Sequence, residues 1–111
     1  MDKGTFEFHY FDSNFRGGIA RAILSSAKQP FENKVVEFGK WPEMKQSGIC
    51  EYGQLPLLIH DGKYFCQSQA IVGYLARLFD IYGKTLDEQY VCDNLLCSNE
   101  DLLAPYHDVI F

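Results

Sequence analysis

The sequence predicts an α/β domain with the element order β-α-β-α-β-β-α, followed by the first helix or helices of an all-α region. Three observations predict it. An aromatic run near the N-terminus alternates strictly, two later segments have apolar residues at helical spacing, and the hairpin dipeptide Asp61-Gly62 separates two short apolar runs. The chain has 111 residues, of which 47% are hydrophobic, and this suits one domain with a real core.

The first four elements follow from alternation and helical spacing. Residues 5–11 (TFEFHYF) alternate and predict a strand that places Phe6, Phe8 and Tyr10 on one face. Residues 15–28 have apolar side chains at helical spacing and predict a helix that ends at Gln29-Pro30. Residues 32–38 (ENKVVEF) predict a second strand. Trp41-Pro42 then opens a short helix, since proline is tolerated in the first turn.

The second half of the domain contains a hairpin and a helix. Residues 56–60 and 63–66 predict two strands joined by the Asp61-Gly62 turn. Ser68 is predicted to cap the next helix, whose buried stripe contains Ala70, Ile71, Tyr74, Leu75 and Leu78. A further helix is expected to begin at Asp87. We therefore expect one domain over residues 1–80, a linker over residues 81–86 and a truncated helical region over residues 87–111.

This element order is that of a thioredoxin-like domain. Disulfide exchange in such a domain needs a cysteine in the loop before the first helix, where the helix N-terminus lowers the thiol pKa. That loop, residues 12–16, has no cysteine, which excludes this chemistry at that site. The four cysteines form no CxxC pair, so we expect reduced, mostly buried thiols and no metal site: Cys50, Cys66, Cys92 and Cys97.

Composition excludes several classes of partner. The formal net charge is -5 and no basic cluster is present, which argues against nucleic-acid binding. No apolar stretch reaches the length of a membrane span, so we expect no membrane insertion. The N-terminal residues lack the pattern of a secretory signal. We therefore expect a cytoplasmic protein.

Two features close together in the chain indicate ligand binding. Pro56 at the start of a strand predicts a cis bond after Leu55, which would leave the Leu55 backbone N–H and C=O available to an extended, peptide-like ligand. Gln67 and Ser68 lie at a predicted helix N-terminus, which is a favourable place for a carboxylate. The alternative for Ser68 is a plain N-cap with no ligand.

The run GQLPLLIHDGKYFCQSQAIVGYLARL resembles the glutathione-site segment of cytosolic glutathione transferases, which has a G-x-[IL]-P element, a D-G hairpin and then Q-S-x-A-I. The segments HYFDSNFRGGIAR and KWPEMK resemble the sigma class, and less closely the alpha and pi classes. The resemblance covers nearly the whole chain. It implies glutathione as co-substrate, conjugation of its thiolate to an electrophile, and a dimer.

The resemblance also implies roles for individual residues. Tyr10 would be the catalytic tyrosine that donates to the glutathione sulfur, with Arg16 supporting it and Ser13 as the rival activator. The remaining residues would bind glutathione: Trp41 and Lys45 its glycine end, Gln54, Leu55 and Pro56 its cysteinyl part, Gln67 and Ser68 its γ-glutamyl end, and Asp101, or its neighbour Glu100, the γ-glutamyl amine across a dimer. Without the resemblance, Tyr10 is a core aromatic and Lys45 a surface charge. His9, His60 and His107 are expected to be structural or exposed.

Two departures from the family pattern leave an alternative open. Asn14 and Phe15 stand where sigma-like sequences have arginine and glycine. The predicted helical region also ends early, so it would leave apolar side chains uncovered: Tyr90, Val91, Leu95, Leu102, Leu103, Val109, Ile110 and Phe111. The alternative is a non-catalytic scaffold, or an accessory subunit of a larger assembly, that keeps the transferase fold.

Overall fold

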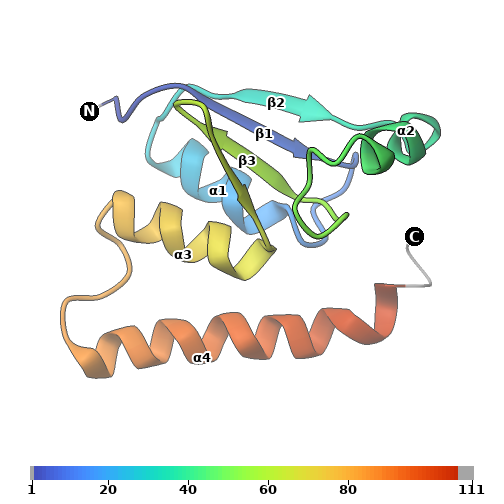
Figure 1. The fold of residues 1–111 in the computed structure, drawn as a ribbon. Helices are drawn as coiled ribbons and strands as arrows, with labels where there is room; N and C mark the ends of the chain where they lie inside the picture. The colour runs from blue at the N-terminus through green and yellow to red at the C-terminus, as the bar shows by residue number, and fades with distance from the viewer. Residues whose placement is uncertain (1, 108–111) are drawn as a thin grey trace.

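The computed structural model describes residues 2–107. Its elements follow in the order β1 (Phe6–Tyr10), α1 (Gly18–Ser26), β2 (Glu32–Val35), the 3-10 turn η1 (Phe38–Lys40), α2 (Trp41–Gln46), β3 (Leu57–His60), β4 (Lys63–Cys66), α3 (Ser68–Leu78), α4 (Leu86–Leu103) and the 3-10 turn η2 (Ala104–Tyr106). This order confirms the thioredoxin-like βαβαββα arrangement with helical structure after it (Figure 1).

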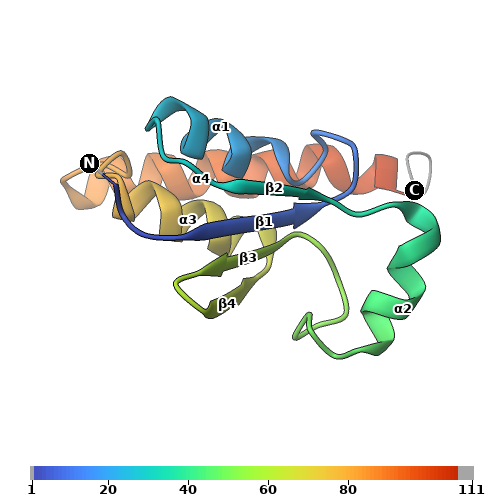
Figure 2. The same cartoon turned by 90° about the horizontal axis from the view of Figure 1, so that it is seen from above.

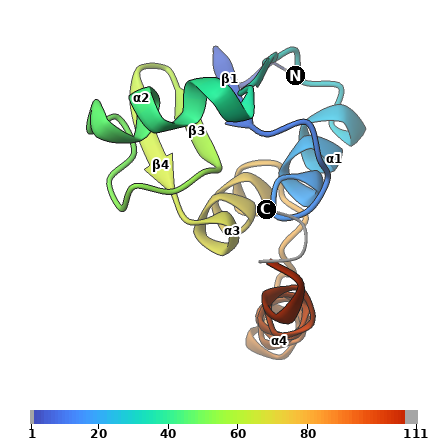
Figure 3. The same ribbon diagram turned by 90° about the vertical axis from the view of Figure 1, so that its right-hand side faces the viewer.

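The four strands form one mixed sheet in the order β2-β1-β3-β4. β1 pairs in parallel with β2 and antiparallel with β3, and β3 pairs antiparallel with β4. Helices α1 and α3 cover one face of this sheet, and α2 lies beyond the strand ends (Figure 2). Helix α4 lies outside α1 and α3 as a further layer, and Figure 3 shows it end on.

The core lies between the sheet and helices α1 and α3. The alternation of β1 directs Phe6, Phe8 and Tyr10 into it, and each is at most 2% exposed. Each of these buried aromatic side chains contributes about 1.5–3 kcal/mol to folding. The other buried members come from both helices, from β3 and from the segment after α3: Ala20, Ile23, Leu24, Leu58, Ile71, Val72, Leu75, Ala76 and Tyr82.

Several predicted boundaries shift by a few residues. Helix α1 begins at Gly18 rather than residue 15, because the chain first makes a turn in which the Ser13 hydroxyl accepts the N–H of Phe15 at 3.0 Å. The strand predicted over residues 32–38 ends at Val35, since η1 begins at Phe38. Helix α4 begins at Leu86 rather than at Asp87. Thr85 and Glu88 form its capping box, and the T-x-x-E pattern that signals this box is present in the sequence.

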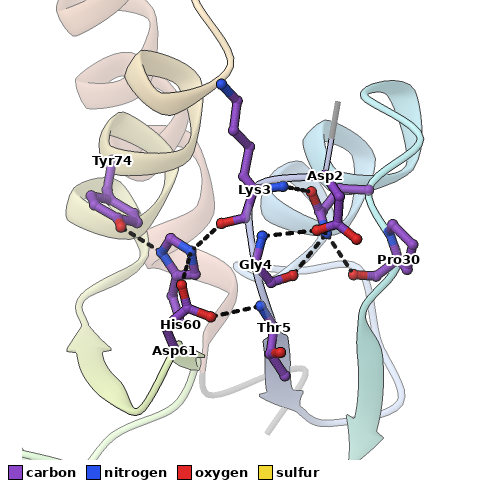
Figure 4. A network of polar contacts seen from close by, with 9 residues as sticks. Asp2, Lys3, Gly4, Thr5, Pro30, His60, Asp61 and Tyr74 are labelled. Atoms are coloured by element: carbon purple, nitrogen blue, oxygen red, sulfur yellow. Dashed lines mark hydrogen bonds and ion pairs between the residues drawn. The ribbon is translucent and has the colours of Figure 1, made fainter.

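The N-terminal segment is fixed by a polar network formed with Gln29 and His60. Figure 4 shows the contacts of His60 with Lys3 and Tyr74. Gln29 is 4% exposed; its amide nitrogen donates to Asp2, Gly4 and Pro30, and its amide oxygen accepts the N–H of Lys3. The Lys3 carbonyl can only accept a hydrogen bond, so Nε2 of His60 carries the proton and Nδ1 accepts from the Tyr74 hydroxyl. His60 is therefore structural, as expected.

Helix α4 exposes most of its apolar side chains. Leu86 is 84% exposed, and four of the predicted uncovered residues are more than half exposed: Tyr90, Val91, Leu95 and Leu102. Leu103 is half-buried, and Val109, Ile110 and Phe111 lie outside the described residues. The expectation of mostly buried thiols was wrong, because only Cys50 is buried while Cys97 on α4 is exposed. Over residues 2–107, no helix is long and apolar enough to cross a membrane.

Candidate functional site

A cavity of about 720 Å³ opens where the C-terminal end of β1, helix α2, the segment before β3 and the first turn of α3 meet. The C-terminal end of α4 and the chain just after η2 close one side of it, through Glu100 and His107. The structure brings all but one of the predicted site residues to this cavity: Tyr10, Arg16, Trp41, Lys45, Gln54, Leu55, Pro56, Gln67 and Ser68. Asp101 is exposed and does not line it.

Tyr10 is held at the base of the cavity by the backbone that follows it. The N–H of Arg16 donates to the Tyr10 hydroxyl at 3.0 Å. Burial raises the pKa of Tyr10, and the hydrogen bond from Arg16 opposes this rise. The phenol therefore keeps its proton at neutral pH and can act as a hydrogen-bond donor.

Gly17 has a specific role beside Tyr10. A Cβ atom at this position would lie 2.5 Å from Cδ2 of the Tyr10 ring, so only glycine lets the backbone pack against the ring. Helix propensity alone predicts only that a glycine at such a position weakens a helix. The close approach of Gly17 fixes the loop that supplies the Arg16 N–H.

The Arg16 side chain pairs with Glu100 on α4, and after burial and the backbone hydrogen bond its positive charge is a further influence on the pKa of Tyr10, which it lowers. Its Nε atom donates to both carboxylate oxygens at 2.9 and 3.0 Å, and Nη2 lies 2.8 Å from Oε1. Both side chains are less than one third exposed, so the pair is partly shielded from solvent. This ion pair ties the end of α4 to the loop that holds Tyr10.

Helix α2 contributes Trp41 and Lys45, four residues apart on one face. The Trp41 ring contacts Phe11 edge-on, with ring centroids 5.9 Å apart. The stem of Lys45 passes beside Gly53, whose backbone has φ of +64°. Lys45 therefore places a positive charge at the wall of the cavity.

The segment before β3 and the start of α3 form the opposite wall. The Leu55-Pro56 peptide bond is cis, as expected. Gln67 has φ of +73° and occupies the N-cap position, so Ser68 is the first residue of α3. The prediction of Ser68 as the N-cap was therefore wrong, because the chain turns one residue earlier.

The whole first turn of α3 lines the cavity, through Gln67, Ser68, Gln69 and Ala70. The first N–H groups of a helix have no partner within it, and the helix dipole is positive at this end. The arrangement can therefore hold a carboxylate, with the Ser68 hydroxyl as a further donor. Together with Lys45, it makes the cavity suitable for an anionic ligand.

Sequence reasoning missed several residues that line the cavity: Phe11, Tyr52, Cys66, Gln69, Glu100 as a partner of Arg16, and His107. His107 was expected to be structural or exposed, and no local pattern links it to the loop near Tyr10. The position of Cys66 directly before Gln67 was the one available signal. Ser13 does not line the cavity, and its hydroxyl accepts the Phe15 N–H. Within residues 2–107, no group of His, Cys, Asp and Glu is arranged to hold a metal ion.

Comparisons with known proteins agree with this geometry. The family model described as the N-terminal domain of glutathione S-transferase matches residues 7–77. A probable glutathione S-transferase 7 of Caenorhabditis elegans is 41% identical over 98 residues, which are 88% of this chain and 47% of that protein.

Solved structures of related proteins also superpose on this chain. A C. elegans-specific nematode GST superposes with a TM-score of 0.83 at 35% identity, over 87% of this chain and 47% of that one. The rat hPGDS complexed with a quinoline superposes with a TM-score of 0.86 at 28% identity, over 95% of this chain and 52% of that one. The chain thus spans about half the length of these relatives.

Proposed function

Because this chain belongs to the glutathione S-transferase family, we propose that its cavity binds glutathione and that, as part of a complete transferase, it directs the glutathione thiolate to an electrophile. One observation carries the proposal. Nine of the ten residues that the family resemblance assigns to the site line a single cavity, although they come from five separate segments of the chain.

In this proposal the γ-glutamyl end of glutathione lies at the start of α3. Its carboxylate accepts from the first N–H groups of the helix and from the Ser68 hydroxyl, and Gln67 binds beside it. The glycine carboxylate lies at the other end, near Trp41 and Lys45. A tripeptide with a carboxylate at each end matches a cavity with donors at both ends.

The cysteinyl part of glutathione then lies in the middle, beside Gln54 and Leu55, with Pro56 behind them. Its sulfur faces Tyr10, whose hydroxyl donates to the thiolate. A hydrogen bond to a charged group contributes about 1.5–3 kcal/mol, and one pKa unit corresponds to about 1.4 kcal/mol. One such bond therefore lowers the thiol pKa by about one unit or more.

The chain supplies only part of a transferase in this proposal. Residues 1–80 form the glutathione-binding domain, residues 81–86 the linker and residues 87–111 the start of the helical domain. The electrophile would be bound by further helical structure or by a partner. We further propose a homodimer, in which Asp101 reaches the glutathione of the partner subunit. The four free cysteines favour a reducing compartment such as the cytoplasm.

A second candidate function is a non-catalytic scaffold or an accessory subunit of a larger assembly. The exposed apolar side chains of α4, with Leu95 at 64% and Leu102 at 66%, favour it because such a face is suited to a protein partner. Transferase turnover by the 111-residue chain alone is expected to be very low under either function, and robust turnover with a general electrophile would contradict this.

Calorimetric titration with glutathione tests the proposal. The unmodified chain should bind, and Ser68→Ala should weaken binding about tenfold or more, because a hydrogen bond to a carboxylate is lost. Ser25→Ala is the matched control, since Ser25 is exposed on α1 away from the cavity. Absence of binding by a chain that circular dichroism shows to be folded would favour the scaffold function.

A further inference from the structure

Two thiols lie close together near the cavity, and one of them, Cys66, lines it. Cys66 is the last residue of the edge strand β4, is half-buried and lines the cavity. Its sulfur accepts the backbone N–H of Glu51 at 3.3 Å. Because that nitrogen is two bonds from the Cα atom of Cys50, the Cys66 sulfur lies within about 6 Å of this Cα atom. Cys50 itself is 3% exposed.

The same hydrogen bond places the Cys66 sulfur beside the backbone of Cys50. A disulfide needs the two Cα atoms about 4.4–6.8 Å apart, a separation that side-chain rotation and a movement of the 47–53 loop toward β4 would supply. Cys66 lines the cavity, whereas Cys50 is buried and does not line it. The two thiols therefore have different access to a dissolved reagent.

We propose that Cys66 and Cys50 form a dithiol that reacts with a small-molecule disulfide in the cavity, and that glutathione disulfide is the member of this class that the cavity selects. The dithiol chemistry stands on the geometry of the two cysteines. The selection of glutathione disulfide rests on the proposed function.

The reaction proceeds by two thiol–disulfide exchanges. The Cys66 thiol loses its proton to solvent and its sulfur attacks one sulfur of the small disulfide. A mixed disulfide forms on Cys66, and the other half leaves as a thiolate that takes up a proton. Cys50 then loses its proton and attacks the Cys66 sulfur, which releases the second half as a thiol. Two protein thiols are oxidised, and one small disulfide is reduced to two thiols.

The order of the two steps follows from the environment of each thiol. Cys66 lines the cavity, so its sulfur is the first of the two to meet a dissolved disulfide. Burial, with a smaller contribution from Cys66, raises the pKa of Cys50. Cys66 is therefore the attacking thiol and Cys50 the resolving thiol.

The two cysteines of α4 provide an internal comparison. Cys97 is exposed and Cys92 is half-buried, and they are five residues apart on the helix, a spacing that does not place them face to face. A small disulfide should leave Cys97 as a single mixed disulfide with no resolving partner. A cysteine that is merely exposed is therefore expected to end as a mixed disulfide, whereas the dithiol is expected to end as an internal disulfide.

Peptide mapping under non-reducing conditions tests the proposal. The full chain is treated with glutathione disulfide or with bis(2-hydroxyethyl) disulfide, alkylated with iodoacetamide and cut with trypsin. Trypsin separates residues 46–63 with Cys50, residues 64–77 with Cys66, and residues 85–111 with the α4 cysteines. We expect the first two peptides to become disulfide-linked, with a glutathione adduct on residues 64–77 appearing first.

Variants identify the role of each thiol. In Cys50→Ser, the adduct on residues 64–77 should accumulate, because the resolving thiol is missing. In Cys66→Ser, Cys50 should remain open to alkylation after denaturation, while Cys97→Ser should leave the cross-link unchanged. If Cys50→Ser fails to fold, the order of products in the unmodified chain identifies the attacking thiol instead. The glutathione adduct on residues 64–77 should appear before the cross-link and decay as the cross-link forms.

The possible outcomes separate this inference from the proposed function. Absence of the cross-link with both disulfides, while Cys97 carries an adduct, would overturn the dithiol. A cross-link formed equally well by the neutral disulfide and by glutathione disulfide, and unaffected by Ser68→Ala, would support the dithiol and overturn the selection of glutathione disulfide. Calorimetric binding of glutathione by Ser68→Ala and the unmodified chain reports on the proposed function independently.

Discussion

Arg16 and Glu100 are joined by hydrogen bonds of 2.9 and 3.0 Å although they lie 84 positions apart in the chain. The backbone N–H of the same arginine holds the Tyr10 hydroxyl. One residue therefore connects α4 to the tyrosine at the base of the cavity. The ion pair joins the far end of α4 to the thioredoxin-like part of the chain.

Glu100→Gln should lower the free energy of unfolding by about 1 kcal/mol, because the amide offers one acceptor where the carboxylate offered two and the charge is lost. Asp101→Asn is the matched control. It removes the same charge from an exposed neighbour and should change stability by no more than about 0.5 kcal/mol. Urea denaturation of both variants measures the difference, and equal effects would contradict a specific role for Glu100.

Tyr10→Phe should raise the pKa of the thiol of bound glutathione by about one unit, because the thiolate loses a hydrogen bond from the phenol. Ultraviolet absorbance of the thiolate, followed against pH with glutathione saturating, measures this. Tyr64→Phe is the control, since Tyr64 is exposed on β4 and does not line the cavity. A rise in the thiol pKa with Ser13→Ala but not with Tyr10→Phe would assign activation to Ser13.

Local patterns predicted the fold well because each element carries its own signal. The alternation of residues 5–11 specified which face of β1 is buried, and Asp61-Gly62 specified the hairpin. The start of α1 was missed because it depends on tertiary contact. Gly17 packs against the Tyr10 ring, and helical spacing alone does not reveal that the chain turns there first.

The sequence predicts those parts of the site that come from one contiguous segment of the family pattern. It does not predict the contacts that form only when distant helices and loops pack together. The segment from Gly53 to Ser68 supplied one wall of the cavity directly from the sequence. The pairing of Arg16 with Glu100 requires α4 to pack beside the β1–α1 loop, and no spacing in the chain encodes this. The position of Cys66 beside Cys50 likewise follows from the 47–53 loop folding back on β4.

Gln29→Glu should lower the free energy of unfolding by about 2–3 kcal/mol at neutral pH, because a carboxylate oxygen would face three acceptors in place of the amide nitrogen. Gln46→Glu is the control; it adds the same charge at an exposed position and should cost no more than about 0.5 kcal/mol. Thermal or urea unfolding measures both.

The penalty of Gln29→Glu should shrink as the pH falls toward about 4, where a protonated carboxyl can again donate one hydrogen bond. The unmodified chain itself should lose stability as the pH falls, which narrows the gap between it and the variant further. Gln29, and to a smaller extent the N–H of Gly4, lowers the pKa of Asp2, so the stability that Asp2 contributes is lost as the pH falls. A penalty that is constant with pH would contradict this account of the network.

The stability that Tyr82 contributes to the chain should be lost in alkaline solution. Its ring is 5% exposed, its hydroxyl donates to the Asp93 carboxylate on α4, and the Arg77 guanidinium lies 4.0 Å from the ring centroid. Burial, together with the bond to Asp93, raises the pKa of Tyr82 to about 12. In the unfolded chain the same phenol has a pKa of about 10.

Between these two values the folded chain keeps the Tyr82 proton while the unfolded chain loses it, so the free energy of unfolding falls as the pH rises from about 10 toward 12. Tyr82→Phe lacks this titration. At pH 8 the variant should be less stable by about 1–2 kcal/mol, because the Asp93 carboxylate loses its donor. Above pH 10 the difference in the free energy of unfolding between the unmodified chain and the variant should narrow. Urea unfolding of both chains at a series of pH values, with Tyr90→Phe as an exposed control, measures it. Parallel curves for the chain and Tyr82→Phe would show that the Tyr82–Asp93 contact does not hold α4 in place in this way.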